Sequence, residues 1–313
     1  MVRGSFIWCF SLCNSGLTLA CHLKFVQICY LRLTFPLAPP CAIFANAINA
    51  FEEGKLVTPA QWDEIKQKVT DAMLAHSRPF VTPLGTETPE TVRLVGTGSY
   101  ANIEDQRLLL TCEHVARTQP MHYRFNGSED VFDHPGPWRM NRHPIDAAFA
   151  PISPAQWTAT RHQAAAIPFK RFASKHTIVE QAELLFFRGY AGENEHYGFG
   201  IHQTNCTGYC VQEKMGSGDG DIFELFWEPD KMEFTSGTSA EARAELKFEN
   251  ARGFSGSLVW NTRYLEIARE GGRTWTPDDA VVTGLLRRWD PDTRTLLVWR
   301  AEHLHAWLQA KGT

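Results

Sequence analysis

A serine with one glycine two residues before it and another directly after it is the pattern in this chain best suited to nucleophilic chemistry. It lies in the stretch Arg252–Trp260, which reads RGFSGSLVW. Gly253 lets the backbone turn so that consecutive N–H groups point the same way, and Gly256 leaves room for a substrate carbonyl. The apolar end of the stretch predicts a strand that anchors the turn. The pattern indicates that Ser255 is a nucleophile beside an oxyanion hole, with an ordinary Gly/Ser turn as the alternative.

A serine hydroxyl is a weak nucleophile, which needs a base within hydrogen-bond reach and a third group that holds the tautomer of the base. Residues 107–116 read RLLLTCEHVA, an apolar run that leads into His114. Residues 143–150 read HPIDAAFA, in which Asp146 opens a second apolar run. The alternatives are a hydrogen-bonded core histidine and an aspartate that only caps a strand, and Asp133 is a competing carboxylate. The chain therefore offers candidates for all three groups.

In the order His114, Asp146, Ser255, these stretches resemble the chymotrypsin/trypsin-like serine protease family, over about residues 80–300. The family motifs L-T-A-A-H-V, D-[IL]-A-[VL] and G-[DN]-S-G-G-P correspond here to LTCEHV, DAAF and GFSGSL. The resemblance implies that Ser255 is the nucleophile, that His114 is the general base and then the acid, and that Asp146 orients the imidazole. It also implies an oxyanion hole formed by the backbone N–H groups of Gly253 and Ser255, and chemistry that needs no cofactor and no metal.

The sequence departs from the family pattern beside the reactive groups. Phe254 stands where trypsin-like zymogens have the aspartate that binds a newly freed amino terminus, and we expect this ring to fill an apolar site instead. Glu113 adds a carboxylate next to His114, which would compete for the imidazole if it points inward. Because Ser257 ends the motif, the stretch is not a G-x-S-x-G elbow, and an α/β-hydrolase is disfavoured.

Two stretches carry the residues expected to contact a substrate side chain. Counting back from the serine, the resemblance places Glu249 at the base of the primary pocket, which favours basic side chains in the substrate. The run 284–289, GLLRRW, resembles the strand that pairs with the substrate backbone and walls that pocket. Arg287 and Trp289 are therefore the other substrate-binding candidates. Arg287 and the adjacent Arg288 favour acidic groups instead, and the sequence leaves this choice open.

The rest of the sequence predicts the elements that position these groups. From Phe80 onward, short apolar runs are separated by turns, many of them with Gly and Pro clusters, which is typical of an all-β sandwich or barrel. With the resemblance, this predicts a double β-barrel of the trypsin-like type. A helix is predicted over residues 58–75, where Thr58 and Gln61 form a capping box. A short C-terminal helix is expected over Glu302–Leu308.

We expect three regions along the 313 residues. Residues 1–50 form a leader or disordered extension, residues 51–78 a helical brace, and residues 79–313 a serine protease domain of two barrels. The leader mimics a secretory signal that ends at Ala45-Asn46-Ala47, but charged residues and prolines interrupt its apolar run. No stretch of it reaches the about 18 uninterrupted apolar residues of a spanning helix, so we expect no integral membrane span.

Composition narrows the partners, the cofactors and the compartment. A net charge of −4 without a long basic run argues against nucleic acid as a partner. The aspartates of Gly216–Asp221 could hold calcium, but we expect an ordinary hairpin turn there. Cys206–Cys210 does not have the spacing of a zinc module, and we expect an ordinary loop. Beyond the leader, the chain has three cysteines (Cys112, Cys206 and Cys210). These are too few for a disulfide framework, which favours a cytoplasmic location over a secreted or periplasmic one.

The sequence therefore predicts a serine endopeptidase that hydrolyses peptide or protein substrates through a Ser-His-Asp triad and an acyl-enzyme. Two alternatives stay open. One is a catalytically silent binding module on the same scaffold, because fold does not fix function. The other is a non-peptide acyl hydrolase that uses the same triad. The natural substrate and the oligomeric state cannot be deduced from the sequence.

Overall fold

The computed structural model describes residues 58–87, 92–134, 136–180, 182–198, 201–235 and 238–312. Two short strands precede them, β1 (Ile7–Trp8) and β2 (Tyr30–Leu33). Apart from these two strands, the expected leader lies outside the described residues, as does its cleavage-like Ala45-Asn46-Ala47. The predicted division of the chain into three regions therefore stays a prediction.

One sheet has eight strands in the order β7-β6-β3-β4-β5-β9-β8, with β10 added in parallel to β4. All its other pairings are antiparallel. Its strands are β3 (Val81–Glu87), β4 (Val92–Ile103), β5 (Gln106–Cys112), β6 (Met121–Tyr123), β7 (Phe132–His134), β8 (Arg139–Asn141), β9 (Ala147–Pro151) and β10 (Ile167–Pro168). This sheet carries both the histidine and the aspartate stretches.

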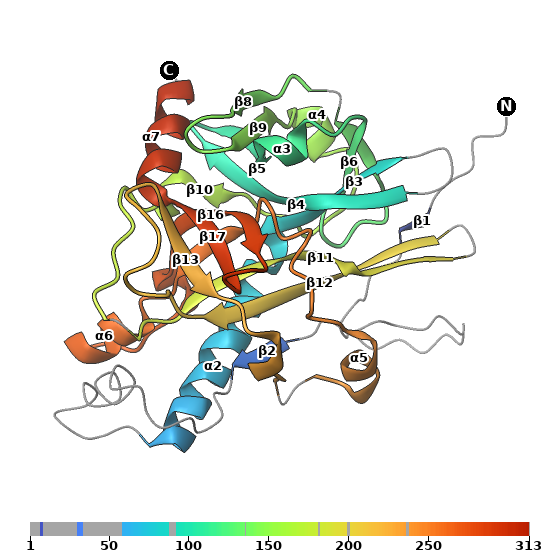
Figure 1. The fold of residues 1–313 in the computed structure, drawn as a ribbon. Helices are drawn as coiled ribbons and strands as arrows, with labels where there is room; N and C mark the ends of the chain where they lie inside the picture. The colour runs from blue at the N-terminus through green and yellow to red at the C-terminus, as the bar shows by residue number, and fades with distance from the viewer. Residues whose placement is uncertain are drawn as a thin grey trace, which may run out of the picture.

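The other sheet has nine strands in the order β13-β17-β16-β15-β11-β12-β2-β14, with β1 paired to β12. Figure 1 shows the two sheets one above the other, joined by the segment that follows β10. The remaining strands of this sheet are β11 (Leu185–Gly198), β12 (Ile201–Val211), β13 (Ile222–Phe226), β14 (Met232–Phe234), β15 (Leu258–Asn261), β16 (Val281–Asp290) and β17 (Thr295–Arg300). The serine stretch leads directly into β15.

Helices are few, and they lie at the edges of the sheets. The α-helices are α2 (Pro59–Ser77), α3 (Glu113–Ala116), α4 (Pro154–Trp157), α5 (Ala240–Glu245), α6 (Tyr264–Glu270) and α7 (Ala301–Gly312). The 3₁₀ turns are η1 (Arg78–Phe80), η2 (Phe169–Arg171), η3 (Pro229–Lys231) and η4 (Pro277–Asp279). Of the helices that the structure describes, none is long and apolar enough to cross a bilayer.

The predicted fold class is confirmed: the chain is mostly β, in two sheets, with a helix before them and a helix after them. The Thr58 side chain accepts the N–H of Gln61, and the predicted capping box is present in full at the start of α2. At the other end, α7 buries the side chains of Leu304, Trp307 and Leu308. A single core cluster includes residues from both sheets, among them Val115 beside His114 and Leu258 after the serine loop.

Two local predictions concern the segments Cys206–Cys210 and Gly216–Asp221. Cys206–Cys210 was expected to be an ordinary loop, and this is wrong: both cysteines lie within β12, where Cys206 pairs with Tyr190 and Cys210 with Phe186 of β11. The Gly216–Asp221 segment does form a turn, in which the Asp219 carboxylate accepts backbone N–H groups of Asp221 and Ile222. That carboxylate stabilises the turn itself.

Candidate active site

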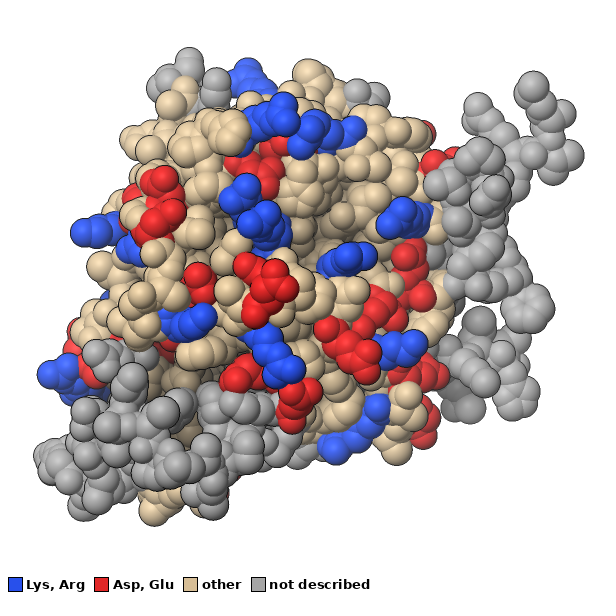
Figure 2. All heavy atoms as spheres, in the orientation of Figure 1, with Lys and Arg blue, Asp and Glu red and all other residues tan. Residues whose placement is uncertain are grey.

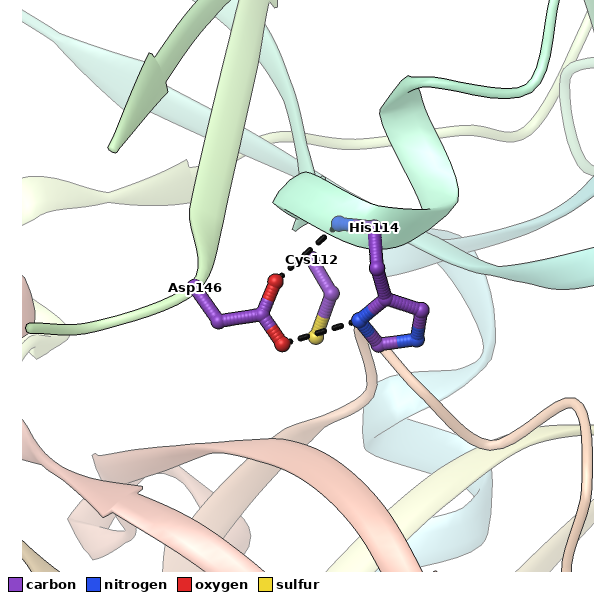
Figure 3. A group of neighbouring side chains, drawn as sticks. All are labelled: Cys112, His114 and Asp146. Atoms are coloured by element: carbon purple, nitrogen blue, oxygen red, sulfur yellow. Dashed lines mark hydrogen bonds and ion pairs between the residues drawn. The ribbon is translucent and has the colours of Figure 1, made fainter. Parts of the chain in front are cut away.

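The register between β5 and β9 brings His114 to Asp146. Cys112, the last residue of β5, pairs with Ala147, the first residue of β9. The chain then turns into α3, so His114 lies beside the residue that precedes β9. The His114 ring Nδ1 is 2.8 Å from Asp146 Oδ2, and the His114 backbone N–H donates to Oδ1 over 3.0 Å (Figure 3). Both carboxylate oxygens of Asp146 therefore hold the same histidine.

Asp146 is buried and held in an unusual backbone conformation. Its φ of +39° lies in the left-handed region, and its carbonyl accepts the backbone N–H of Glu113 over 3.0 Å. Burial alone would raise the pKa of Asp146, but the hydrogen bonds and charge of His114, followed by the charge of Arg287, hold that pKa below its usual value. Asp146 is therefore ionised at neutral pH and fixes the imidazole with Nδ1–H toward it, which leaves Nε2 to act as a base.

The serine loop is pinned to both sheets through backbone hydrogen bonds. Gly256 N–H donates to Leu286 O of β16 over 2.9 Å, and Ser255 O accepts the N–H of Thr97 of β4 over 2.9 Å. The two glycines have φ of +102° at Gly253 and +93° at Gly256. A Cβ at Gly256 would lie 2.1 Å from Thr97 O, so only glycine fits there.

The histidine and serine segments meet at a shared glycine. A Cβ on Gly96 would lie 2.7 Å from the side chain of Val115, the residue after His114, and 3.1 Å from Ser255 O. Val115 and the serine carbonyl therefore flank the same point of β4. Within the described residues, Ser255 Oγ makes no hydrogen bond. His114 is therefore hydrogen-bonded to Asp146 but not to Ser255. Catalytic hydrogen bonds are often long in ligand-free structures and tighten with substrate.

The backbone around Ser255 leaves two N–H groups available. Arg252 O accepts the N–H of Gly192 over 2.8 Å, and Gly253 O accepts the Thr97 hydroxyl over 2.9 Å. Both carbonyls are therefore engaged by the protein. Among the described residues, the N–H groups of Gly253 and Ser255 have no acceptor. These are the two donors that the sequence assigned to an oxyanion hole.

Phe254 fills an apolar site, as the sequence predicted. Its side chain is 0% exposed. Its ring contacts Phe187, Tyr209 and Trp227 edge-on, at centroid distances of 5.3, 5.4 and 5.8 Å. The residue between the two oxyanion-hole candidates is thus fixed by aromatic packing in the second sheet.

The two carboxylates considered as competitors for His114 have other partners. Glu113 is buried and pairs with Arg117 Nε over 3.0 Å, which directs it away from the imidazole. Asp133 binds the ring Nδ1 of His122 over 2.7 Å, between β6 and β7. Of the three aspartate and glutamate candidates, Asp146 alone is in contact with His114.

The substrate-binding candidates fall in two places. Glu249 and Trp289 line one cavity of about 290 Å³, together with Trp227, Pro229, Asp230, Pro291 and Arg294. Trp227 also touches Phe254, so the cavity adjoins the serine loop. Arg287 does not line it, and its Nε lies 3.5 Å from Asp146 Oδ2. On the face shown in Figure 2, the described basic and acidic side chains are interspersed.

Sequence reasoning missed Thr97 and the role of Arg287. Thr97 N–H holds Ser255 O, and its hydroxyl holds Gly253 O while accepting the N–H of Tyr190 over 3.0 Å. The sequence holds only a weak indication of Thr97, its position between Gly96 and Gly98. In the structure, a side chain at Gly96 would clash with Val115, and one at Gly98 would clash with Leu109. Strand pairing over long sequence separations creates both contacts.

Cys112, His114 and Asp146 offer three ligand atoms within 4.8 Å of one another (Figure 3). A divalent cation would need a thiolate here, but burial raises the pKa of the Cys112 thiol well above its usual value. The thiol donates to Leu286 O instead, over 3.3 Å. Arg287 already supplies a positive charge beside the carboxylate. The donor set therefore suits proton transfer better than a metal ion.

No protein-family model matches the sequence, and no curated protein matches it either. Solved structures similar to this chain include a protease of M. tuberculosis in its active form, at 14% identity and a TM-score of 0.40, covering 77% of this chain and 85% of that one. The serine protease domain of the Sesbania mosaic virus polyprotein matches at 12% identity and a TM-score of 0.37, with coverages of 74% and 92%. The MamO protease domain from Magnetospirillum magneticum matches at 10% identity and a TM-score of 0.41, with coverages of 74% and 96%. Because these TM-scores lie below 0.5, the function of this chain has to be inferred from the contacts within it.

Proposed function

We propose that the chain is a serine endopeptidase that uses Ser255, His114 and Asp146 as a catalytic triad. The observation that supports this best is the ring contact of His114 Nδ1 with a buried, ionised Asp146, beside a serine loop with two unengaged N–H groups. The His114 side chain is 39% exposed, so its far edge is accessible to a substrate.

In the proposed reaction, His114 Nε2 takes the proton of Ser255 as Oγ attacks the scissile carbonyl. The N–H groups of Gly253 and Ser255 receive the oxyanion, and losing one such donor typically raises the barrier by about 2.7–4 kcal/mol. The imidazolium then gives its proton to the leaving amine, and an acyl-enzyme remains. Water, deprotonated by His114, releases the acid product and restores the serine.

We propose that the cavity beside the serine loop takes a substrate side chain, and that basic side chains fit it best. Glu249 is exposed there, and it has no ion pair among the described residues. Asp230 pairs with Arg294 over 3.0 Å, so these two charges offset each other. Trp289 also lines the cavity, and a tryptophan ring attracts cations.

A catalytically silent binding module is the second candidate, because Ser255 Oγ and His114 Nε2 are not hydrogen-bonded here. A fluorophosphonate probe separates the two, since it bonds covalently to an activated serine. We expect labelling of the wild type and its loss in Ser255→Ala and His114→Ala. In peptide hydrolysis, these changes should cost about 10⁶-fold in turnover, and Asp146→Asn about 10⁴-fold.

Ser257→Ala is the matched control, because this serine is buried in the same loop and its hydroxyl has no partner in the described part of the chain. It should label like the wild type. Near-normal peptide hydrolysis by Ser255→Ala would refute the assignment. Labelling without hydrolysis of a peptide library, but with hydrolysis of simple esters, would favour the non-peptide acyl hydrolase.

A further inference from the structure

We infer that Arg287 is a positioning residue of this site, which shares the Asp146 carboxylate with His114 and sets the lowest pH at which the imidazole serves as base. This inference rests on the proposed function. The sequence suggested a contact between Arg287 and the substrate. The structure places the guanidinium against the triad aspartate instead.

A β-bulge directs the Arg287 side chain. Between β16 and β17, Leu286 pairs with Val298 and Arg288 pairs with Leu297, so Arg287 is an extra residue without a partner. Bulges change the direction of a side chain and occur beside active sites. The preceding residue is fixed on its other edge, because Leu286 O accepts Gly256 N–H and Leu286 N–H donates to Ser257 O, each over 2.9 Å.

The guanidinium is held in place from two sides. Its Nε lies 3.5 Å from Asp146 Oδ2, the same oxygen that lies 2.8 Å from His114 Nδ1. Its Cζ lies 5.0 Å from the centre of the Trp299 ring, a cation–π distance. The side chain is 31% exposed, so substrate or solvent still reaches it. A partly exposed ion pair of this kind adds little to stability, and its effect is on the local charge.

The consequence for catalysis comes from counting charges. When His114 is neutral, Asp146 and Arg287 form a balanced pair. When His114 is protonated, two cations share one carboxylate, which disfavours the imidazolium. Removing Arg287 should therefore favour the protonated imidazole, which cannot act as a base. The charge of Arg287 also helps to keep Asp146 ionised.

Other ionisable groups near the carboxylate do not offset this effect. The Cys112 thiol is uncharged because burial raises its pKa. Glu113 is neutralised by Arg117, over 3.0 Å. The segment before β9, the serine loop and β16 carry further charged side chains: the basic Arg139, Arg142, Arg252 and Arg288, and the acidic Asp290, which is the last residue of β16.

The test compares Arg287→Met with the wild type, since methionine keeps an apolar stem against Trp299 and removes the charge. We expect the acidic limb of kcat/KM against pH to move up by about half a unit to one unit, as expected for a charge at this distance and partial exposure. Arg287→Lys should move the limb less. Arg288→Met removes an exposed charge from the same strand and should not move it.

A second measurement does not depend on turnover. In Ser255→Ala, the titration midpoint of the His114 ring signal by NMR should rise by a similar amount when Arg287→Met is added. The inference would be overturned if Arg287→Met moved neither the acidic limb of kcat/KM nor the NMR titration midpoint of His114. It would also be overturned if Arg288→Met shifted the acidic limb as far as Arg287→Met does. If the wild type takes no fluorophosphonate, the proposed function fails, and the NMR titration still decides whether Arg287 governs the His114 charge.

Discussion

Phe254 is the single residue that most clearly sets the geometry of the serine loop. It lies between Gly253 and Ser255, and its ring is 0% exposed among Phe187, Tyr209 and Trp227. A side chain packed on several sides leaves its backbone few alternative positions. The direction of the two candidate oxyanion donors therefore depends on a hydrophobic contact on the far side of the loop.

We predict that Phe254→Ala lowers the free energy of unfolding by about 3–5 kcal/mol, because it leaves a cavity among rigid rings. Fluorophosphonate labelling per folded molecule should fall as well, since the loop loses its support. Chemical denaturation and quantified labelling measure the two effects. Phe254→Leu fills more of the site and should lose less of both. A Phe254→Ala protein as stable as the wild type would contradict the role of this ring.

The candidate catalytic residues were readable from the sequence because each follows or opens an apolar strand in a recognisable local motif. His114 and Asp146 were named from such motifs, and the structure brings them into contact. Thr97 and Arg287 were not readable in the same way. Their contacts with Gly253 O and Asp146 depend on strand pairing and on a bulge between β16 and β17. Neither feature leaves a local pattern in the chain.

Among the elements, α2 was predicted best and the long strands worst. The helix was expected over residues 58–75 and spans Pro59–Ser77, because its cap and its apolar stripe are local. By contrast, the sequence predicts only short strands after Phe80, whereas β4 extends over Val92–Ile103. Its later part contains glycines and polar residues. The pairing with β3 and β5 extends the strand there, and hydrophobicity alone does not reveal that extent.

His76, in the last turn of α2, gives the attachment of this helix a pH dependence. Its ring lies between Phe80 and Trp260, at centroid distances of 5.4 and 5.9 Å. Burial lowers the pKa of His76, the charge of Arg171 lowers it further, and Asp278 opposes the shift. The folded protein binds a proton at His76 less readily than the unfolded chain does. The stability that neutral His76 contributes is therefore present above pH about 6.5, the pKa of histidine in the unfolded chain, and is lost as the pH falls below that value.

We predict that the melting temperature falls between about pH 7 and pH 5, and that His76→Gln reduces this slope. Calorimetry at several pH values measures it. The slope should not vanish, because burial also lowers the pKa of His134. His143→Gln is the control: this histidine is exposed, and its removal should leave the slope unchanged. Equal slopes for the wild type and His76→Gln would show that α2 does not respond to His76 protonation.

At the scale of the whole molecule, α2 joins the start of the described chain to the second sheet. It buries Val69, Met73 and Leu74 at 0 to 1% exposure. The buried guanidinium of Arg188 in β11 donates to Leu74 O and to the sulfur of Cys206. Losing the helix would leave that charge without one of its partners, which is costly for a buried group. We propose that α2 is a brace that the two sheets need in order to fold.

The serine loop should also be formed without any proteolytic cut. In trypsin-like zymogens, a freed amino terminus pairs with the aspartate before the serine; here that position holds Phe254, which has no carboxylate and already fills its site. We predict that a protein beginning near Phe51, which lacks β1 and β2, takes fluorophosphonate as well as the full chain does, per folded molecule. A protein beginning near Ala75 lacks Val69, Met73 and Leu74 and should not fold, because it loses the apolar face and the acceptor of Arg188. The folded fraction, measured by circular dichroism, separates loss of folding from loss of activation. Labelling that arises only after one defined N-terminal cleavage, with an unchanged folded fraction, would refute a preformed loop.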